Sequence, residues 1–251
     1  MDTVDILNKE FFTQKFSEEH PYSELLEKYK CIAGNYARME SAVAVLSDLR
    51  TNKSYIYYGN FSRMLEIDNN RDEDKVSSIW EKEIFNIIHP DDLTGKHLQE
   101  LCFFHFVKHQ PKRKRADYYL ISKLRMKNAG NNYIPVLHRM FYIFAPSNDT
   151  FWLALCLYGP LLFDIPAKCL IVNSTNGQMF EIGKQDNTRI LSVREKQVLN
   201  LIDKGMASKK IAETLSISIH TVSRHRQEIL AKLQVRNSIE ACRVAKDLKL
   251  I

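Results

Sequence analysis

The stretch LSVREKQVLNLIDKGMASKKIAETLSISIHTVSRHRQEILAKL, residues 191–233, decides how the C-terminal quarter of the chain folds. Ser192 and Glu195 have the spacing of a capping box, in which each side chain accepts a hydrogen bond from the other residue's backbone N–H. A helix is therefore expected to begin at Ser192. Gly205 follows the apolar positions of this helix. The end of a helix favours a residue in the left-handed conformation, so the helix is expected to end there.

Two more helices are predicted after Gly205. The first begins at Ser208, residues 216–218 form a tight turn, and the next helix covers 219–233. The expected buried positions of the shorter helix are Ile211, Ala212 and Leu215. Two short helices joined by such a turn form a helix-turn-helix, whose second helix enters the major groove of DNA.

The helix 219–233 has two different sides when its residues are placed about 100° apart. The side expected to face the core holds Val222, Arg226, Ile229 and Leu233, with Leu230 at its margin. The opposite side holds His220, Arg224, Gln227, Glu228 and Ala231. Hydrogen-bonding side chains beside a small residue suit a surface that faces base edges. Thr221, His225 and Lys232 lie at the flanks, where phosphates are expected.

Many residues at fixed spacing give this region a close resemblance to the LuxR-type helix-turn-helix family. The matching positions are Leu191, Ser192, Arg194, Glu195, Val198, Leu199, Gly205, Lys209, Ile211, Ala212, Leu215, Ile217, Ser218, Thr221, Val222, His225, Ile229, Lys232, Leu233, Val235, Glu240 and Ala241. The resemblance implies base reading by Ser223, Arg224 and Gln227, and phosphate contacts that include Thr221 and His225. We add Lys209, His220, Glu228 and Lys232 to the expected DNA-binding set.

The family resemblance also implies a dimer contact on a fourth helix, here 237–249. Val244, Ala245 and Leu248 are the residues expected to form it. Three positions depart from the family pattern: Ser223 replaces a common lysine, Glu228 an asparagine, and Ser238 an arginine. The operator sequence of relatives is therefore not carried over to this chain.

Positive charge is concentrated in the same region. From Arg189 onward there are 13 lysines and arginines against 6 acidic residues, a net charge of +7, whereas the remainder has a net charge of −1. A second basic run, 112–115, falls between a predicted helix and a predicted strand, and we interpret it as a solvated loop. The charge distribution indicates that the last quarter alone binds a polyanion such as double-stranded DNA.

The N-terminal part has the pattern of an α+β domain. Residues 1–36 are expected to form a helical segment. Two strands (42–49 and 54–58), helices (77–88 and 90–109), three longer strands (118–126, 133–144 and 151–158) and a short hairpin (169–173 and 178–182) then follow. The predicted division is a helical segment at 1–36, an α+β domain at 37–183, a linker at 184–190, and an all-α tetrahelical helix-turn-helix domain at 191–251.

This order of elements resembles a PAS-like sensor domain over about residues 34–160. The best local match is the run from Ile84 to Leu93, which contains His89-Pro90-Asp91-Asp92. Pro90 suits the first turn of a helix, and the two aspartates complement its positive N-terminal dipole. The resemblance implies that this domain receives a signal, from a small-molecule ligand or a protein partner. The alternative is a domain that only dimerises or docks a protein.

Other front domains and other chemistry are not favoured. A phosphoryl-receiver domain needs a regular βα alternation, and an acyl-homoserine-lactone sensor needs a Trp/Tyr/Asp set; neither pattern is found. No spacing indicates a catalytic site, so no enzyme activity and no catalytic residues are expected. Helix capping and ordinary surface positions account for the histidines at 89, 97, 105 and 109, so neither a metal nor another cofactor is expected.

The remaining sequence features concern location and assembly. The five cysteines form no C-x-x-C pair and are expected to be reduced core residues. The start of the chain lacks the features of a secretory signal, and its most apolar segment, 151–163, is too short to cross a bilayer. We therefore expect a cytoplasmic homodimer that binds double-stranded DNA and does not contact a membrane.

Overall fold

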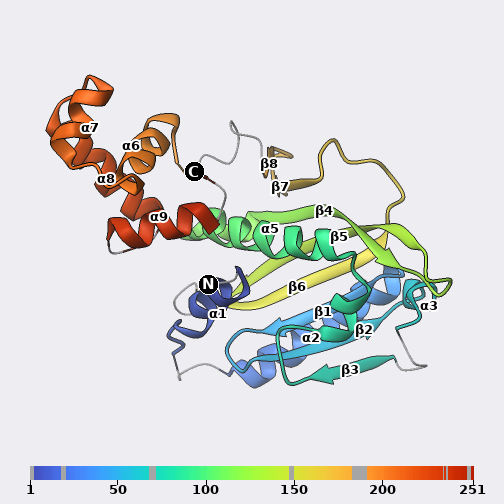
Figure 1. Cartoon of the computed structure of the whole chain (residues 1–251). Coiled ribbons are helices and arrows are strands. Elements are labelled where there is room, and N and C mark those ends of the chain that lie inside the picture. The colour runs from blue at the N-terminus through green and yellow to red at the C-terminus, as the bar shows by residue number, and fades with distance from the viewer. Residues whose placement is uncertain are drawn as a thin grey trace.

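The computed structural model describes residues 3–17, 21–67, 72–146, 150–182, 191–233, 235, 237–247 and 250–251. Within them, an antiparallel sheet with helices on both faces forms the N-terminal part, and helices α6 to α9 pack on one another in the C-terminal part (Figure 1). The predicted linker, 184–190, lies outside the described residues. None of the described helices has the length and apolar composition needed to span a membrane.

A single antiparallel sheet contains the eight strands found in the described residues, in the order β3-β2-β1-β6-β5-β4-β7-β8. The strands are β1 (Val43–Asp48), β2 (Lys53–Tyr58), β3 (Glu73–Val76), β4 (Tyr118–Lys127), β5 (Tyr133–Phe144), β6 (Phe151–Pro160), β7 (Cys169–Asn173) and β8 (Met179–Glu181). β1 pairs with β6 in a register that places Val45 opposite Cys156. The first hairpin and the three long strands predicted from the sequence are thus joined through the centre of one sheet.

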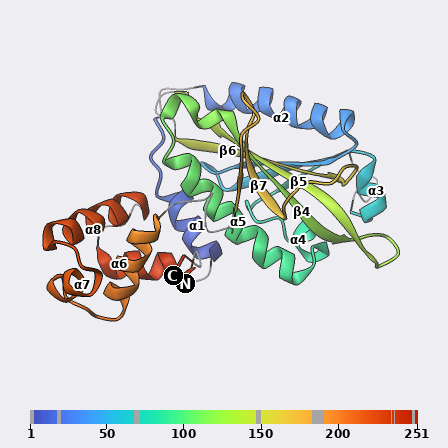
Figure 2. The same ribbon diagram turned by 90° about the horizontal axis from the view of Figure 1, so that it is seen from above.

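The centre of this sheet is covered on both faces. α2 (Tyr22–Met39) lies along one face and α5 (Pro90–Lys108) along the other (Figure 2). All six residues of β1 are buried, and β6 is buried from Phe151 to Tyr158. Strands covered on both faces need apolar residues at successive positions, which explains why these two lack a clear alternation.

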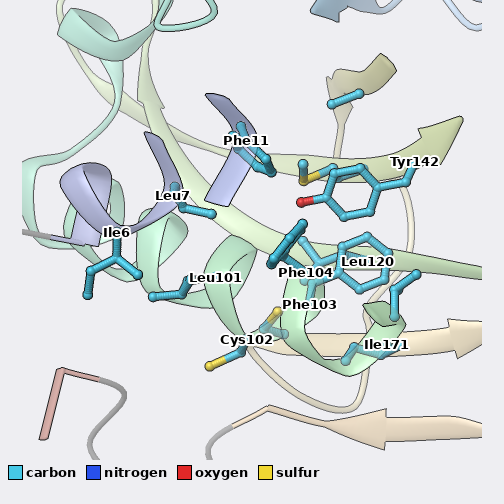
Figure 3. Close-up of a cluster of buried hydrophobic side chains, with 14 of the residues drawn as sticks. Ile6, Leu7, Phe11, Leu101, Cys102, Phe103, Phe104, Leu120, Tyr142 and Ile171 are labelled. Carbon is cyan, nitrogen blue, oxygen red and sulfur yellow. The ribbon is translucent and has the colours of Figure 1, made fainter. Parts of the chain in front are cut away.

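The N-terminal helix α1 (Thr3–Phe12) is part of the core on the α5 face. Leu7 is fully buried, and the ring of Phe11 meets that of Phe104 edge-on, with centroids 5.3 Å apart. Figure 3 shows Leu7 and Phe11 directed toward the aromatic residues of α5 and toward Tyr142 of β5. The first helix therefore completes the hydrophobic core of the sheet domain.

The start of α5 is fixed by a capping side chain and by ion pairs of a buried aspartate, in addition to the helix dipole. His89 caps the helix by accepting a hydrogen bond from the Asp91 backbone N–H, and Pro90 occupies the first turn, as predicted. Asp92 is buried and accepts hydrogen bonds from the Arg125 side chain (2.8 Å) and from Lys168 Nζ (2.9 Å). Burial alone would raise the pKa of Asp92, but these two cations hold it well below its usual range. The aspartate thus ties α5 to β4 and to the loop before β7.

The predicted helix at 77–88 is wrong in its first half. Only α4 (Lys82–Ile87) is helical, and the preceding residues form bends and the short strand β3. Ser78 Oγ accepts from the Trp80 backbone N–H, and Asn52 accepts from that of Ile79. These bonds compete with a helical turn, while β3 pairs with the edge of β2.

The other short elements and the cysteines complete the N-terminal part. α3 (Phe61–Leu65) was not predicted, and the basic run 112–115 lies in an exposed 3-10 helix, η1 (Lys112–Asp117). Cys102, Cys156, Cys169 and Cys242 are buried free thiols. Cys31 is exposed, so the expectation of a core position is wrong for this residue, which lies on the solvent side of α2.

Four C-terminal helices follow the predicted pattern: α6 (Val193–Asp203), α7 (Ser208–Leu215), α8 (Ile219–Leu233) and α9 (Ser238–Asp247). The observed bounds of α8 are those expected from the sequence. α9 lies beside α1, and Lys9 Nζ is 3.5 Å from the Glu240 carboxylate (Figure 1).

Candidate nucleic-acid interface

The capping box fixes the first helix of the C-terminal bundle. Ser192 Oγ accepts from the Glu195 backbone N–H at 3.2 Å, and the Glu195 carboxylate accepts from the Ser192 backbone N–H at 2.5 Å. Val198 and Leu199 of α6 are fully buried. Reciprocal satisfaction of two backbone donors explains why the helix starts where the sequence predicts.

Two residues with positive φ set the turns on either side of α7. Gly205 has a φ of 76° after α6, and Ser216 has a φ of 53° after α7. A left-handed residue after the last helical turn lets its neighbours satisfy the terminal carbonyls, and glycine adopts this conformation without a Cβ clash. Arg194 also donates to the Leu215 carbonyl at 2.8 Å, which joins the start of α6 to the end of α7.

Ser218 is the cap of α8, a role that the sequence analysis missed. Its hydroxyl accepts from the Thr221 backbone N–H at 3.0 Å and lies 2.8 Å from the Thr221 hydroxyl. A serine three residues before a threonine, directly after a turn, was the available signal. The cap fixes the N-terminal end of the helix proposed to approach DNA.

The described side chains on the core-facing side of α8 agree with the predicted placement, and the side chain of Leu233 lies outside the described residues. Val222 and Ile229 are buried. Arg226 lies half-buried on this side, where its guanidinium donates to the hydroxyls of Ser208 (3.1 Å) and Ser238 (2.9 Å). One arginine therefore connects α7, α8 and α9, which explains a charged residue on a side that otherwise packs inward.

The opposite side of α8 is open to solvent. His220, Ser223, Arg224 and Gln227 are exposed, and Glu228 is half-buried. The Arg224 side chain is 69% exposed, and its Nε lies 3.4 Å from the Glu228 carboxylate. A pair this exposed is weak and leaves the guanidinium available to a nucleic acid. The structure thus brings four of the predicted contact residues together on one surface.

The remaining residues predicted to contact DNA differ in how exposed their side chains are. Lys209 is exposed in the first turn of α7, and Thr221 is half-buried beside its cap. The side chain of His225 is only 12% exposed, and its Nδ1 lies 3.4 Å from Glu228. The side chain of Lys232 lies outside the described residues. His225 is therefore much less accessible than Arg224, whose side chain is 69% exposed.

The predicted dimer residues on α9 are described only in part. Ala245 is fully buried in the chain's own core, so in this structure it is not on a surface that a second copy can contact. α9 packs against α6 and α8, which explains this burial. The side chain of Val244 and the whole of Leu248 lie outside the described residues.

A second concentration of polar groups lies inside the N-terminal domain, on the α5 face of the sheet. Glu81, Lys96 and Glu100 are buried, with Lys96 Nζ 2.5 Å from Glu100 and Ser47 Oγ donating to Glu81 at 3.1 Å. Burial raises the pKa of Glu81. All three line a cavity of about 30 Å³, which has room for one or two water molecules.

The opposite side of the sheet has an open apolar groove. It has a volume of about 810 Å³ and is lined by β4 and β5 residues together with the segment after β6. Leu162 and Phe163 in that segment are exposed. The domain thus has a small polar cavity, with room for water but not for a drug-sized ligand, and an open apolar face, which favours a partner.

Comparison with known proteins finds a similarity to luxR-type regulators at the C-terminal end. Residues 189–245 match the family of bacterial regulatory proteins, luxR family. The oxygen regulatory protein NreC of Staphylococcus carnosus (strain TM300) is 40% identical over 79 residues, which are 32% of this chain and 32% of that protein. NreC of Staphylococcus aureus (strain MRSA252) is 34% identical over 95 residues, 37% of this chain and 44% of that protein. The chain thus spans less than half the length of these relatives.

Solved structures give a weaker likeness. The match to the crystal structure of the phage VqmA-DPO complex covers 89% of this chain and 89% of the VqmA chain, with 13% identity and a TM-score of 0.32. The match to the crystal structure of Escherichia coli SdiA covers 99% of this chain and 97% of the SdiA chain, with 15% identity and a TM-score of 0.26. Scores this low carry no argument about the fold or ligand of this chain.

Proposed function

We propose that this protein is a sequence-specific DNA-binding transcription regulator that receives a signal through its N-terminal domain. The observation that carries the proposal is the exposed polar side of α8. This helix follows α7 through a tight turn, buries Val222 and Ile229 in its own bundle, and leaves Arg224 and Gln227 in solvent. The second helix of a helix-turn-helix presents such side chains to base edges in the major groove.

The proposed contacts divide into two kinds. Ser223, Arg224 and Gln227 read bases, since they share the exposed side of α8. Thr221, His225 and Lys232 position phosphates, and Lys209 and His220 complete the proposed DNA-binding set. Arginine donates two hydrogen bonds to O6 and N7 of guanine, whereas a lysine beside a phosphate gives affinity without sequence preference. The Glu228 carboxylate either repels a phosphate or accepts a hydrogen bond from a cytosine amino group.

Assembly as a homodimer on a roughly two-fold operator is part of the proposal, because helix-turn-helix proteins of this kind read two half-sites. α9 is the proposed dimer element, with Val244 and Leu248 as its contact residues. Since the proposed ligand is DNA, we propose the cytoplasm as the location of the protein. The boundaries proposed for the DNA-binding domain are residues 191 and 251.

For the N-terminal domain we propose a PAS-like sensor at 37–183. Its support is the order of elements, with two strands, helices and three long antiparallel strands in one sheet, and the buried polar interior beneath α5. The open groove on the other face supports the alternative, a dimerisation or docking module without a ligand. The two alternatives differ in which face of the sheet is occupied.

The test of the DNA-binding proposal compares two single substitutions in the full chain. The operator is first selected from random duplexes, and Arg224→Ala and Lys232→Ala are then titrated against all single-base operator variants. Arg224→Ala is expected to lose about 1–3 kcal/mol of discrimination at one position. Lys232→Ala is expected to weaken all duplexes alike. Uniform weakening by Arg224→Ala would assign it to a phosphate, and failure of the full chain to select any sequence would overturn the proposal.

A further inference from the structure

A histidine, a cysteine and a glutamate meet in the core of the N-terminal domain, a convergence that neither the sequence pattern nor the proposed function explains. One ligand atom each from Glu100, His138 and Cys156 lies within 4.8 Å of the others. All three residues are buried, with exposed fractions of 4%, 0% and 8%. They come from α5, β5 and β6, so the tertiary fold alone brings them together.

The register of the sheet directs two of these residues to the same face. His138 is paired with Tyr158 of β6, and Cys156 lies two positions before Tyr158, where side chains return to the same side of a strand. α5 covers that face and contributes Glu100 (Figure 2). The Tyr158 ring stacks on the His138 ring at a centroid distance of 4.9 Å and limits its rotation.

His138 has the hydrogen-bonding pattern of an oriented metal ligand. Ser122 Oγ is 3.1 Å from its Nδ1, while its Nε2 is buried without a hydrogen-bond partner in the described structure. A buried ring nitrogen without a partner is unfavourable, and metal-binding histidines characteristically use their second nitrogen for an orienting bond. Ser122 thus holds the ring while Nε2 remains available.

The remaining ligands and the cavity fit the same centre. Among the described residues, Lys96 Nζ donates to Oε1 of Glu100, so Oε2 is the carboxylate oxygen that can be offered to a metal. The small cavity of about 30 Å³ is lined by both Glu100 and Cys156. It has room for water next to both side chains, which would supply the fourth position of a tetrahedral site.

With Glu81 ionised, the buried charges balance when a divalent cation is added, although burial raises the pKa of Glu81. The charged side chains that act on Cys156 are Lys96, Glu100 and Glu81, with a net charge of −1 when all three are ionised. Binding releases the thiol proton to solvent as the sulfur–metal bond forms, which adds a second negative charge. A divalent ion brings the total to zero, a favourable arrangement for buried charges.

We propose that Glu100, His138 and Cys156 form a binding site for a zinc-class divalent cation, completed by water from the adjoining cavity. One nitrogen, one sulfur and one oxygen ligand suit Zn²⁺ in tetrahedral geometry. The site lies in the N-terminal domain and does not depend on the DNA-binding proposal, because metal binding is measured without DNA.

The experiment uses the full-length protein, freed of metal by a chelator and then titrated with Co²⁺ and Zn²⁺. One equivalent of Co²⁺ is expected to give a thiolate-to-cobalt charge-transfer band that Zn²⁺ removes. X-ray absorption of the zinc-loaded protein is expected to show one sulfur among nitrogen and oxygen ligands. Since this measurement needs no variant, it decides the proposal even where a core substitution impairs folding.

The variants separate this site from other thiols and histidines. Cys156→Ala is expected to abolish the band, and His138→Gln and Glu100→Gln to weaken binding by more than the ~10–100-fold that the loss of an orienting partner costs. Cys102→Ala and Cys31→Ser are matched controls, one thiol buried in α5 and one exposed, and both are expected to retain the band. A zinc spectrum without sulfur, or a band that persists in folded Cys156→Ala, overturns the proposal. Glu195, His225 and Glu228 also lie close together. Metal held by these three residues would give a zinc spectrum without sulfur.

Discussion

At the scale of single residues, His105 is the clearest source of pH dependence. It is 1% exposed in α5, and neither ring nitrogen has a hydrogen-bond partner in the described structure. Burial lowers the pKa of His105 to about 4. A histidine in an unfolded chain has a pKa of about 6.5, so the unfolded state binds the proton first as the pH falls.

We expect the free energy of unfolding of the N-terminal domain to fall between pH 6.5 and 4, with His105 contributing up to about 3 kcal/mol. The contribution is complete above pH 6.5 and lost as the pH approaches 4. His105→Phe is expected to reduce this slope, whereas His220→Gln, at an exposed position, leaves it unchanged. Urea unfolding followed by tryptophan fluorescence measures the free energy of unfolding at each pH. Both tryptophans, Trp80 and Trp152, lie in the N-terminal domain. Equal slopes for His105→Phe and the native chain would contradict the assignment.

At the scale of elements, α6 and α7 differ in how they begin. α6 has a complete capping box formed by Ser192 and Glu195. α7 begins after Ala207, whose backbone has the extended conformation of a cap (φ −68°, ψ 152°) but whose side chain makes no capping bond. Serine at a cap satisfies a backbone donor that alanine leaves to water.

This difference predicts opposite effects for two reciprocal substitutions. Ser192→Ala is expected to destabilise the start of α6 by about 1 kcal/mol, and Ala207→Ser to stabilise the start of α7 by up to about 1 kcal/mol. Hydrogen exchange of the full chain, followed by mass spectrometry, is the measurement. Exchange in the first turn of α6 should accelerate in one variant, and exchange in that of α7 should slow in the other. Unchanged exchange of α7 in Ala207→Ser would show that the new hydroxyl does not cap the helix.

At the scale of the whole molecule, two basic regions compete as binding sites for DNA. The C-terminal region from Arg189 carries the net charge of +7, and the other region is the exposed η1. η1 contains Lys112 and Lys114, both exposed, at the end of α5 that leads into β4. A region that contacts phosphates contributes to the salt dependence of binding, and one that faces only solvent does not.

Two double variants with the same change in charge test this division. Lys209→Gln with Lys232→Gln is expected to reduce the slope of log affinity against log salt by about two ions, since each phosphate contact contributes about 0.9. Lys112→Gln with Lys114→Gln is expected to leave affinity and slope unchanged. Binding of the full chain to its selected operator is measured at several salt concentrations. A reduced slope in the second variant would add η1 to the DNA-binding surface.

Sequence alone determined the helices of the C-terminal bundle and the side of α8 proposed to read DNA. The signals were local: Ser192 with Glu195 three residues later, Gly205 after the last turn, and the periodicity of 219–233. Interactions over three or four residues follow from helical geometry, so they are visible in the sequence. The interior side of α8 was also predicted, although the bonds of Arg226 to Ser208 and Ser238 were not.

Only the tertiary structure decided the features that depend on distant residues. The strand Glu73–Val76 exists because it pairs with the edge of β2, and its own residues carry no clear strand signal. Ala245 proved to be buried because α9 packs on α6 and α8. Glu100, His138 and Cys156 meet because an antiparallel register and a covering helix bring three separate elements to one point. Such contacts are set by how strands pair and helices pack, which a local pattern of residues does not encode.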